Sequence, residues 1–321
     1  MPKTRRSKVL NPKEILKTKL LELFSDRDEN NTELNDVPQK WEKHGDLILL
    51  PSSSFRKDVW LQFGDKLWDI VAEALNANRV ARKSTIQNDD FRSPRVELLK
   101  GEDSWVTHID NKIKYTFDVT KCMFSSGNIS EKLRIAKFCC EGETIVDLYA
   151  GIGYFTLPFI IHAKAELVHA CEWNPHAAEA LEKNLILNKV REKCVIHFGD
   201  NRQVCPEKVA DRVNLGLIPS SESGWETACR ALKPSGGILH VHGNVISNMK
   251  SKTIPMENNK CNMVEWTEWA EHVRCKIETI LSDLYHYSWL VEVLNINHIK
   301  SYAPHIDHLV VDINCKCAVG Q

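Results

Sequence analysis

Two glycines that follow an apolar run are the first residues of this chain whose type and spacing could do chemistry. Gly151 and Gly153 lie in Thr144-Ile-Val-Asp-Leu-Tyr-Ala-Gly-Ile-Gly-Tyr-Phe-Thr156, which predicts a buried strand, a turn and a helix. Glycines in such a turn let backbone N–H groups approach a ligand that side chains would obstruct. A dinucleotide-binding turn has a third glycine where Thr156 stands, so a dinucleotide-dependent oxidoreductase is disfavoured.

Polar residues follow the next two predicted strands. Glu172 stands where an acid can accept both hydroxyls of a ribose, and Asp200 and Asn201 stand where a carboxylate and an amide can hold an adenine. Because the carboxyl ends of parallel strands share one edge of a sheet, these residues and the glycine turn should converge on one crevice. The Asp-x-x-x-Gly-x-Gly form of the turn, with Asp147 and Tyr149, resembles the first motif of class I S-adenosylmethionine-dependent methyltransferases. The sequence therefore predicts a site for S-adenosylmethionine.

The segment after the fourth predicted strand is expected to form the substrate side of the site. Asn214 is followed by an apolar stretch and then by Pro219, Ser220 and Ser221. Base-methylating enzymes commonly grip an exocyclic amine here with Asn-Pro-Pro-Tyr or Asn-Leu-Pro, and neither pattern stands in this chain. Ser221 is alternatively the cap of the helix that begins at Glu222.

A polar loop precedes the first strand of the same predicted sheet. Phe124-Ser-Ser-Gly-Asn128 leads into a helix, and Ser125 is a predicted holder of an anionic group. Lys132 falls in the first helical turn, where a cation is unfavourable to the helix dipole. A bound carboxylate, such as that of a methionine moiety, would compensate for it. A solvated surface lysine is the alternative.

The elements that must position these residues are strands and helices in alternation. Short buried-type strands near 144–149, 167–171, 194–198 and 212–217 are separated by helical segments, a rhythm typical of a doubly wound, mostly parallel sheet. A strand, an amphipathic helix and a hairpin precede them. The fold class is therefore α/β, with a class I methyltransferase-like (Rossmann-type) domain preceded by a small α+β module.

These patterns divide the chain into four parts. We expect a mobile N-terminal arm over 1–40 with one short helix at 12–24, a small α+β module over 41–121, an S-adenosylmethionine-binding catalytic domain over 122–315 and a tail over 316–321. The arm is basic in its first half and acidic in its second. Its basic run is interpreted as a solvated terminus, with an RNA-contacting segment or a nuclear localisation signal as alternatives.

The composition excludes whole classes of protein. The chain has 321 residues, of which 43% are hydrophobic, enough for a sizeable core. Its net charge of -1 gives no global signal for nucleic acid, although a local basic patch is compatible with it. No segment approaches the roughly 18 apolar residues of a membrane span, and no secretory signal is predicted. The 11 cysteines, none in a C-x-x-C pair, indicate a reduced, cytoplasmic protein without a metal site, a nuclear location being the alternative.

Taken together, the motifs resemble those of the tRNA wybutosine-synthesising 3-amino-3-carboxypropyl transferases, which are relatives of the enzymes that methylate guanine nitrogen-1 beside the anticodon. The resemblance covers about 41–315 and is carried by segments 41–50, 118–132, 146–158, 169–176, 196–202, 214–222 and 300–308. Phe-Ser-x-Gly-Asn at 124–128 and Leu-Gly-Leu-Ile-Pro-Ser-Ser-Glu at 215–222 distinguish the transferases from their methyltransferase relatives.

The resemblance implies an activity, a cofactor and a partner. The expected enzyme transfers the 3-amino-3-carboxypropyl group of S-adenosylmethionine to carbon 7 of 4-demethylwyosine in phenylalanine tRNA and releases 5′-methylthioadenosine. No metal, membrane or obligate protein partner is implied. The family's ligand positions carry over onto Ser125, Lys132, Glu172, Asp200 and Asn201.

The catalytic residue and two alternative functions stay open. Asp118, Glu131 and His308 are weak candidates for a general base. A guanine nitrogen-1 methyltransferase on the same fold is the first alternative, and the segment after Asn214 argues against it. A catalytically silent RNA-binding subunit is the second, and the intact glycine turn with Glu172 and its neighbours argues against that.

Overall fold

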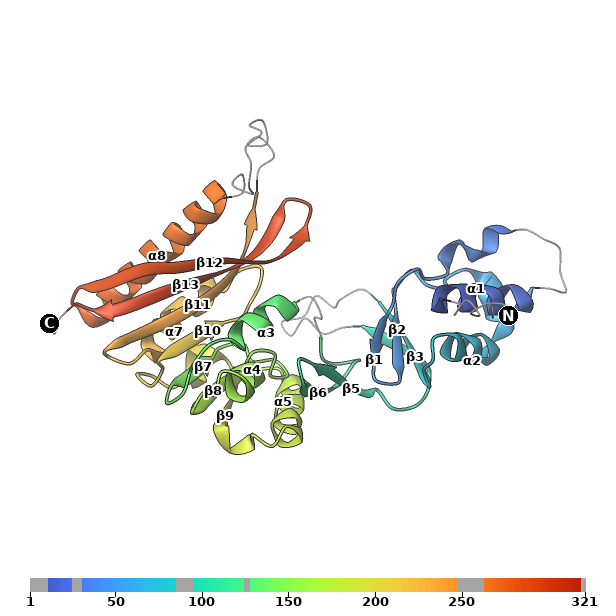
Figure 1. Cartoon of the computed structure of the whole chain (residues 1–321), viewed down its shortest axis with the longest axis horizontal. Coiled ribbons are helices and arrows are strands. Elements are labelled where there is room, and N and C mark those ends of the chain that lie inside the picture. The colour runs from blue at the N-terminus through green and yellow to red at the C-terminus, as the bar shows by residue number, and fades with distance from the viewer. Residues whose placement is uncertain (1–10, 25–30, 85–94, 124–127, 248–262, 319–321) are drawn as a thin grey trace, which may run out of the picture. The chain divides into compact units, whose positions relative to one another are not determined.

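The chain divides into two compact units in the computed structural model, which describes residues 11–24, 31–84, 95–123, 128–247 and 263–318 (Figure 1). The first unit comprises Met1–His108 and Thr116–Phe124, and the second comprises Ile109–Tyr115 and Ser125–Gln321. Among the described helices, none is long and apolar enough to cross a membrane.

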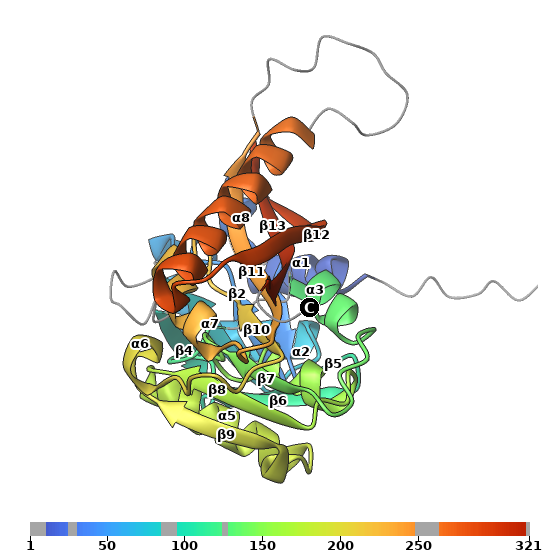
Figure 2. The same ribbon diagram turned by 90° about the vertical axis from the view of Figure 1, so that its left-hand side faces the viewer.

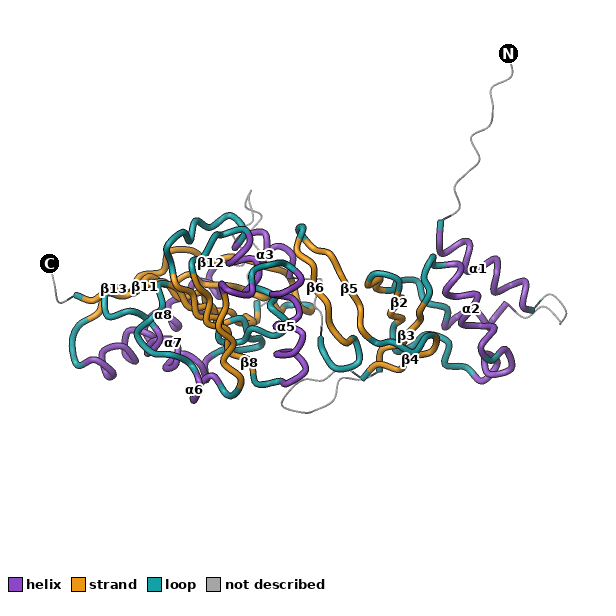
Figure 3. Tube along the Cα trace, turned by 90° about the horizontal axis from the view of Figure 1, so that it is seen from below, coloured by secondary structure: helices purple, strands orange, loops and turns teal. Residues whose placement is uncertain are grey.

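The first unit is a four-stranded sheet with helices on one face. Its strand order is β1-β2-β3-β4, in which β2 and β3 are parallel and the outer pairs are antiparallel. Ile48, Leu50 and Val80 pack against α1 and α2, which lie side by side (Figure 3). Because strand side chains alternate, Leu49 and Lys83 lie on the opposite face. The elements are α1 (Pro12–Leu23), η1 (Asn31–Asp36), β1 (Glu42–His44), β2 (Leu47–Leu50), η2 (Asp58–Phe63), α2 (Asp65–Ala74), β3 (Arg79–Lys83) and β4 (Val96–Lys100).

Helix α1 confirms the short helix predicted at 12–24 and corrects the expectation that this part of the arm is mobile. Asn11 caps the helix, and Glu14 completes a capping box with it. Leu16 and Leu20, four residues apart and therefore on one face, are 1% and 0% exposed in the core of the first unit. Burial of this apolar stripe makes the helix part of the folded unit.

A hairpin and a long terminal strand mark the remaining boundaries. β5 (Trp105–Asp110) and β6 (Ile113–Asp118) pair as a two-stranded sheet, which confirms the predicted hairpin. β13 continues to Cys317, so the tail predicted from 316 begins inside a strand. Its backbone remains paired there, since Lys316 lies opposite Gly236 in the sheet.

The second unit is a seven-stranded, mostly parallel sheet with helices on both faces, as predicted (Figure 2). The order is β12-β13-β11-β10-β7-β8-β9, and β13 alone runs antiparallel to the other strands of this sheet, since it pairs antiparallel with both β11 and β12. The order reverses beside β7, so the carboxyl ends of β7, β8 and β10 border a crevice. The elements are α3 (Ile129–Ile135), β7 (Thr144–Asp147), α4 (Thr156–Ile161), β8 (Leu167–Glu172), α5 (Pro175–Leu187), η4 (Arg191–Lys193), β9 (Cys194–Phe198), α6 (Asn201–Val204), β10 (Arg212–Leu215), η5 (Glu222–Gly224), α7 (Trp225–Ala231), β11 (Gly236–Ile246), α8 (Met263–Tyr285), β12 (Trp289–Ala303) and β13 (Ile306–Cys317).

One apolar core of the second unit lies under α7 and α8. Val146, Val213 and Leu239 are neighbours on three adjacent strands. Because side chains alternate along each strand, all three point to the face covered by these helices, where they are fully buried. At Gly243 of β11 a Cβ would lie 2.6 Å from Trp269, so glycine permits α8 to approach the sheet closely. The opposite face of the strands, toward α3 and α4, carries polar residues.

Candidate cofactor site

The loop between β7 and α4 is a tight turn tied to the next strand. Gly151 and Gly153 have φ of +56° and +98°, in the left-handed region that favours glycine. A Cβ on Gly153 would lie 2.9 Å from Leu181 of α5. The backbone N–H of Gly151 donates to Glu172 Oε2 at 2.7 Å, and Tyr149 lies half-buried in the same loop. The predicted turn is thus held at the end of β7 beside the end of β8.

Asp147 lies behind the turn, which corrects its predicted role as a cofactor-binding residue. Its buried carboxylate accepts hydrogen bonds from the Thr156 hydroxyl at 2.7 Å and from Asn214 Nδ2 at 3.0 Å. Burial raises the pKa of Asp147, and these two hydrogen bonds oppose the rise. Asn214, expected on the substrate side, is likewise fully buried. Both residues therefore fix β7, β10 and α4 to one another.

Glu172 presents an oriented carboxylate at the end of β8. Its Oε2 accepts from the N–H of Gly151 at 2.7 Å, and its Oε1 accepts from the N–H of Asn174 at 2.8 Å. Burial raises the pKa of Glu172, and the backbone hydrogen bonds lower it. Each carboxylate oxygen has a second lone pair, so the group can accept two more hydrogen bonds in a fixed direction. A pair of neighbouring hydroxyls, as on a ribose, fits that arrangement.

The two polar residues after β9 border the same edge of the sheet. Asp200 caps α6 by accepting from the N–H of Arg202 at 3.0 Å and forms an ion pair with the Arg202 guanidinium. This hydrogen-bonded arginine lowers the pKa of Asp200. Asn201 Nδ2 donates to the carbonyl of Leu148 at 3.1 Å, which joins the end of β9 to the glycine turn. The structure thus brings Asp200 and Asn201 to the turn, as predicted from the strand order.

The segment after β10 is fastened to β11. The N–H of Asn244 donates to the carbonyl of Pro219 at 2.8 Å. Ser221 is fully buried, donates to a β11 carbonyl at 3.1 Å and accepts from Trp225 Nε1 at 3.3 Å. Its hydroxyl therefore neither caps a helix nor reaches a substrate, which corrects both interpretations of this residue. Pro219 and Ser220 are exposed.

Lys132 binds a carboxylate that the chain itself supplies. Its side chain is buried, and its Nζ lies 2.9 Å from Asp110 Oδ2 and 4.7 Å from the centroid of the Tyr115 ring. Burial lowers the pKa of Lys132, and the hydrogen bond with Asp110 raises it. Asp110 thus provides the compensating negative charge that the sequence assigned to a ligand. Ser125, the other predicted holder of the ligand's charged chain, lies outside the described residues.

Two of the three general-base candidates meet in a buried cluster beneath α3. Glu131 accepts from Arg134 at 2.7 and 2.8 Å and lies 3.9 Å from His242 Nε2. His242 Nδ1 and His308 Nε2 are 3.1 Å apart. Burial lowers the pKa of both imidazoles to about 3, so both are neutral at physiological pH. Asp118 belongs to the first unit.

A row of polar side chains crosses the same face of the sheet. Asp147, Asn214, His240 and Asp312 are successive partners across β7, β10, β11 and β13. His240 Nδ1 lies 2.6 Å from Asp312 Oδ1, and Arg134 donates to Asp312 Oδ2 at 2.7 Å. Burial raises the pKa of Asp312, but the hydrogen bond with His240 and the charge of Arg134 outweigh that effect and lower this pKa to about 2.

Sequence reasoning missed the basic and imidazole members of this layer. For Arg134, the available signal was its spacing of three residues from Glu131 on one helix. For His240 and His242, the signal was their spacing of two residues within an apolar strand, because side chains two residues apart point to the same face of a sheet. For Asp110, no local pattern indicated a lysine partner 22 residues away.

The ends of β7, β8 and β9 together can hold a nucleoside. The glycine turn leaves space where side chains would stand, and Glu172 offers acceptors that are already oriented. Asp200 and Asn201 border the same edge. Within the described parts of the chain, no group of three or more His, Cys, Asp or Glu side chains is arranged to hold a metal ion.

Two family models match the chain. Residues 106–266 match the TRM5/TYW2 methyltransferase domain, and residues 20–104 match the TYW2 N-terminal domain.

Relatives and solved structures agree with these matches. The tRNA wybutosine-synthesizing protein 2 homolog of Danio rerio is 50% identical over 296 residues, which cover 88% of this chain and 72% of the relative. TYW2 of P. horikoshii, solved in complex with MeSAdo, is 30% identical with a TM-score of 0.70, covering 94% of this chain and 99% of that one. TYW2 of M. jannaschii, in complex with AdoMet, is 26% identical with a TM-score of 0.62, covering 87% and 100%.

Proposed function

Because this chain belongs to the TYW2 family of tRNA wybutosine-synthesising proteins, we propose that it is an S-adenosylmethionine-dependent tRNA transferase. It would transfer the 3-amino-3-carboxypropyl group to carbon 7 of 4-demethylwyosine and release 5′-methylthioadenosine. The observation that carries the proposal is the match of the chain to both family models. The hydrogen bond from the Gly151 N–H to Glu172 Oε2, at 2.7 Å, agrees with it because it orients an acceptor beside the glycine turn. A relative solved with AdoMet supports the choice of co-substrate.

The proposed macromolecular substrate is phenylalanine tRNA that carries 4-demethylwyosine beside the anticodon. The names of the relatives support a tRNA substrate, and the particular tRNA is part of the proposal. The chain would act without an obligate protein partner. Pro219 and Ser220, exposed at the end of β10, are the proposed neighbours of the target base.

The chain's main contribution to this reaction is orientation. S-adenosylmethionine supplies an electrophilic carbon on its sulfonium, and the carbon that lies in line with the nucleophile reacts. Glu172, Asp200 and Asn201 would hold the nucleoside. Ser125 and Lys132 are the proposed holders of the amino-carboxylate chain, and Lys132 would then exchange or share its bond to Asp110.

Transfer to carbon 7 also requires a proton acceptor. As the new carbon–carbon bond forms, the carbon–sulfur bond breaks, and the hydrogen on carbon 7 leaves as a proton. His308 is a poor acceptor because burial holds its pKa at about 3. Glu131 is likewise a poor acceptor, because it is fully buried and both of its carboxylate oxygens accept from Arg134.

The test is to identify the nucleoside released from S-adenosylmethionine. The protein is incubated with the co-substrate and tRNA carrying 4-demethylwyosine, and the products are analysed by mass spectrometry. We expect 5′-methylthioadenosine together with a matching gain of the four-carbon group on the tRNA. S-adenosylhomocysteine with a gained methyl group would overturn the proposal and favour the guanine nitrogen-1 methyltransferase.

A further inference from the structure

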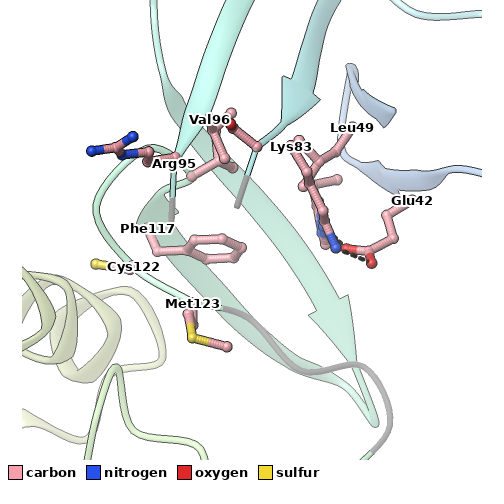
Figure 4. A pocket seen from close by; sticks show the side chains of 11 residues that line it. Glu42, Leu49, Lys83, Arg95, Val96, Phe117, Cys122 and Met123 are labelled. Carbon is pink, nitrogen blue, oxygen red and sulfur yellow. Dashed lines mark hydrogen bonds and ion pairs between the residues drawn. The ribbon is translucent and has the colours of Figure 1, made fainter. Parts of the chain in front are cut away.

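The first unit has a pocket on the face of its sheet that α1 and α2 leave uncovered. Its volume is about 110 Å³. Leu49 and Val96 line it from β2 and β4, Phe117 lines it from β6, and Met123 lines it from the segment that follows β6 (Figure 4). All of its lining residues belong to the first unit. None of the residues assigned to the cofactor site lies in it.

The apolar interior of this pocket has the size of one aromatic ring. An apolar cavity of about 150 Å³ binds benzene in a protein interior, so a pocket of 110 Å³ has room for at most a single ring and not for a fused pair. The ring of Phe117, a residue that is 2% exposed, borders the space (Figure 4). Bases of single-stranded nucleic acid stack on such aromatic side chains.

Charged side chains at the rim of the pocket can form hydrogen bonds with a bound base. Glu42 Oε1 lies 2.5 Å from Lys83 Nζ, and Glu42 Oε2 lies 3.3 Å from His44 Nε2. The hydrogen bond from His44 and the charge of Lys83 lower the pKa of Glu42 to about 2, so its carboxylate is ionised and accepts hydrogen bonds. The Glu42 and Lys83 side chains are 36% and 41% exposed, which leaves both accessible to the polar edge of a base.

Arg95 adds a cation suited to a phosphate. It is exposed beside the pocket, and its side chain points away from the Glu42–Lys83 pair (Figure 4). In the described parts of the chain its guanidinium has no ion-pair or hydrogen-bond partner. A guanidinium with uncommitted donors can bind two oxygens of one phosphate.

We propose that this pocket binds one unpaired pyrimidine nucleotide of the tRNA substrate. The base ring enters beside Phe117, its polar edge meets Glu42 and Lys83, and a neighbouring phosphate binds Arg95. The inference rests on the proposed function only in taking tRNA as the substrate. It assigns to the first unit a nucleotide contact separate from the reacting base.

The test measures tRNA binding by the full chain as a function of salt. Arg95→Ala removes the phosphate contact, and Val96→Trp fills the ring-sized space. Lys66→Ala is the matched control, because Lys66 is an exposed cation on α2, on the other face of the sheet. We expect Arg95→Ala to reduce the slope of log affinity against log salt by about 0.7 to 0.9, the effect of one phosphate contact. Lys66→Ala should leave the slope unchanged.

Val96→Trp should weaken tRNA binding by about tenfold, the order of one lost stacking contact. It should also abolish any preference of the wild-type protein for short oligo(U) over oligo(A). Retention of the thermal unfolding transition that does not respond to S-adenosylmethionine reports whether the first unit of the variant remains folded, and affinity for S-adenosylmethionine reports on the second.

The possible outcomes separate this inference from the proposed function. If the wild-type protein transfers the group to tRNA and both pocket variants behave like Lys66→Ala, the pocket inference is overturned and the proposed function stands. If no transfer is seen but the variants lose tRNA or oligo(U) affinity as stated, the nucleotide pocket is supported and the proposed function fails. A wild-type preference for oligo(A) would overturn the assignment to a pyrimidine.

Discussion

At the scale of single residues, Glu172 is the side chain on which cofactor affinity should depend most. Its carboxylate is anchored by two backbone N–H groups at 2.7 and 2.8 Å and has acceptor capacity left for a ribose. Glu172→Ala removes hydrogen bonds to a charged acceptor that contribute about 1.5–3 kcal/mol each at most. We expect S-adenosylmethionine affinity to fall by at least tenfold, as measured by calorimetry.

Two companion variants make that measurement specific. Glu172→Gln retains one acceptor oxygen and should lose less affinity than Glu172→Ala. Glu166→Ala removes an exposed acid outside the site and should bind like wild type. Unchanged affinity in Glu172→Ala would mean that the ribose binds elsewhere.

At the scale of elements, the antiparallel pair β11 and β13 brings two histidines together beneath α3. Burial holds the pKa of His242 and His308 at about 3 in the folded protein, against about 6.5 in an unfolded chain. Below pH 6.5 the unfolded chain therefore binds protons that the folded protein does not, until about pH 3. The contribution of the two neutral imidazoles to the free energy of unfolding should be fully present above pH 6.5. Below that pH the free energy of unfolding should fall, by at most about 1.4 kcal/mol per pH unit for each imidazole. The charged and titratable groups that act on the pair are Glu131, Arg134, His240, His298, Lys300 and Asp312.

Urea unfolding between pH 7.5 and 5.5 measures this dependence. His308→Asn should show a shallower decline than wild type, whereas His176→Gln, which alters an exposed histidine of α5, should not. The raised pKa values of Asp147 and Glu172 act in the opposite sense. Since those carboxyls are common to all variants, the comparison isolates the buried histidine. Equal slopes in His308→Asn and wild type would contradict the prediction.

At the scale of the whole molecule, two hydrophobic cores of the described residues, one in each unit, have no residue in common. One core joins α1 and α2 to the first sheet, and the other joins α7 and α8 to the second. A ligand of the second unit stabilises the fold that binds it, by about 2.7 kcal/mol at a concentration of 100 times Kd. We expect calorimetric unfolding in two transitions, of which S-adenosylmethionine raises the temperature of only one.

The variant Glu172→Ala identifies the transition that belongs to the cofactor site. In that variant the ligand-dependent shift should disappear while both transitions remain. A single transition, or an equal shift of two transitions, would show that the units unfold together.

Local sequence was sufficient for the glycine turn and its acidic partner. Gly151 and Gly153 were predictable because a positive φ is a property of the residue itself. Glu172 was predictable because an acid after a buried strand of a parallel sheet must lie at the carboxyl edge. The parallel sheet followed from the alternation of strands and helices, and the hairpin before it from its turn residues.

Tertiary structure alone decided which of the predicted polar residues face a ligand. Asp147 bonds to Asn214, 67 residues away, and Lys132 bonds to Asp110, because strand order brings these partners together. Leu16 and Leu20 belong to a helix half of whose residues are polar, and packing against α2 and the first sheet makes their burial favourable. A sequence specifies which groups can accept, donate or avoid water. Which partner satisfies each group depends on contacts between segments that no local pattern contains.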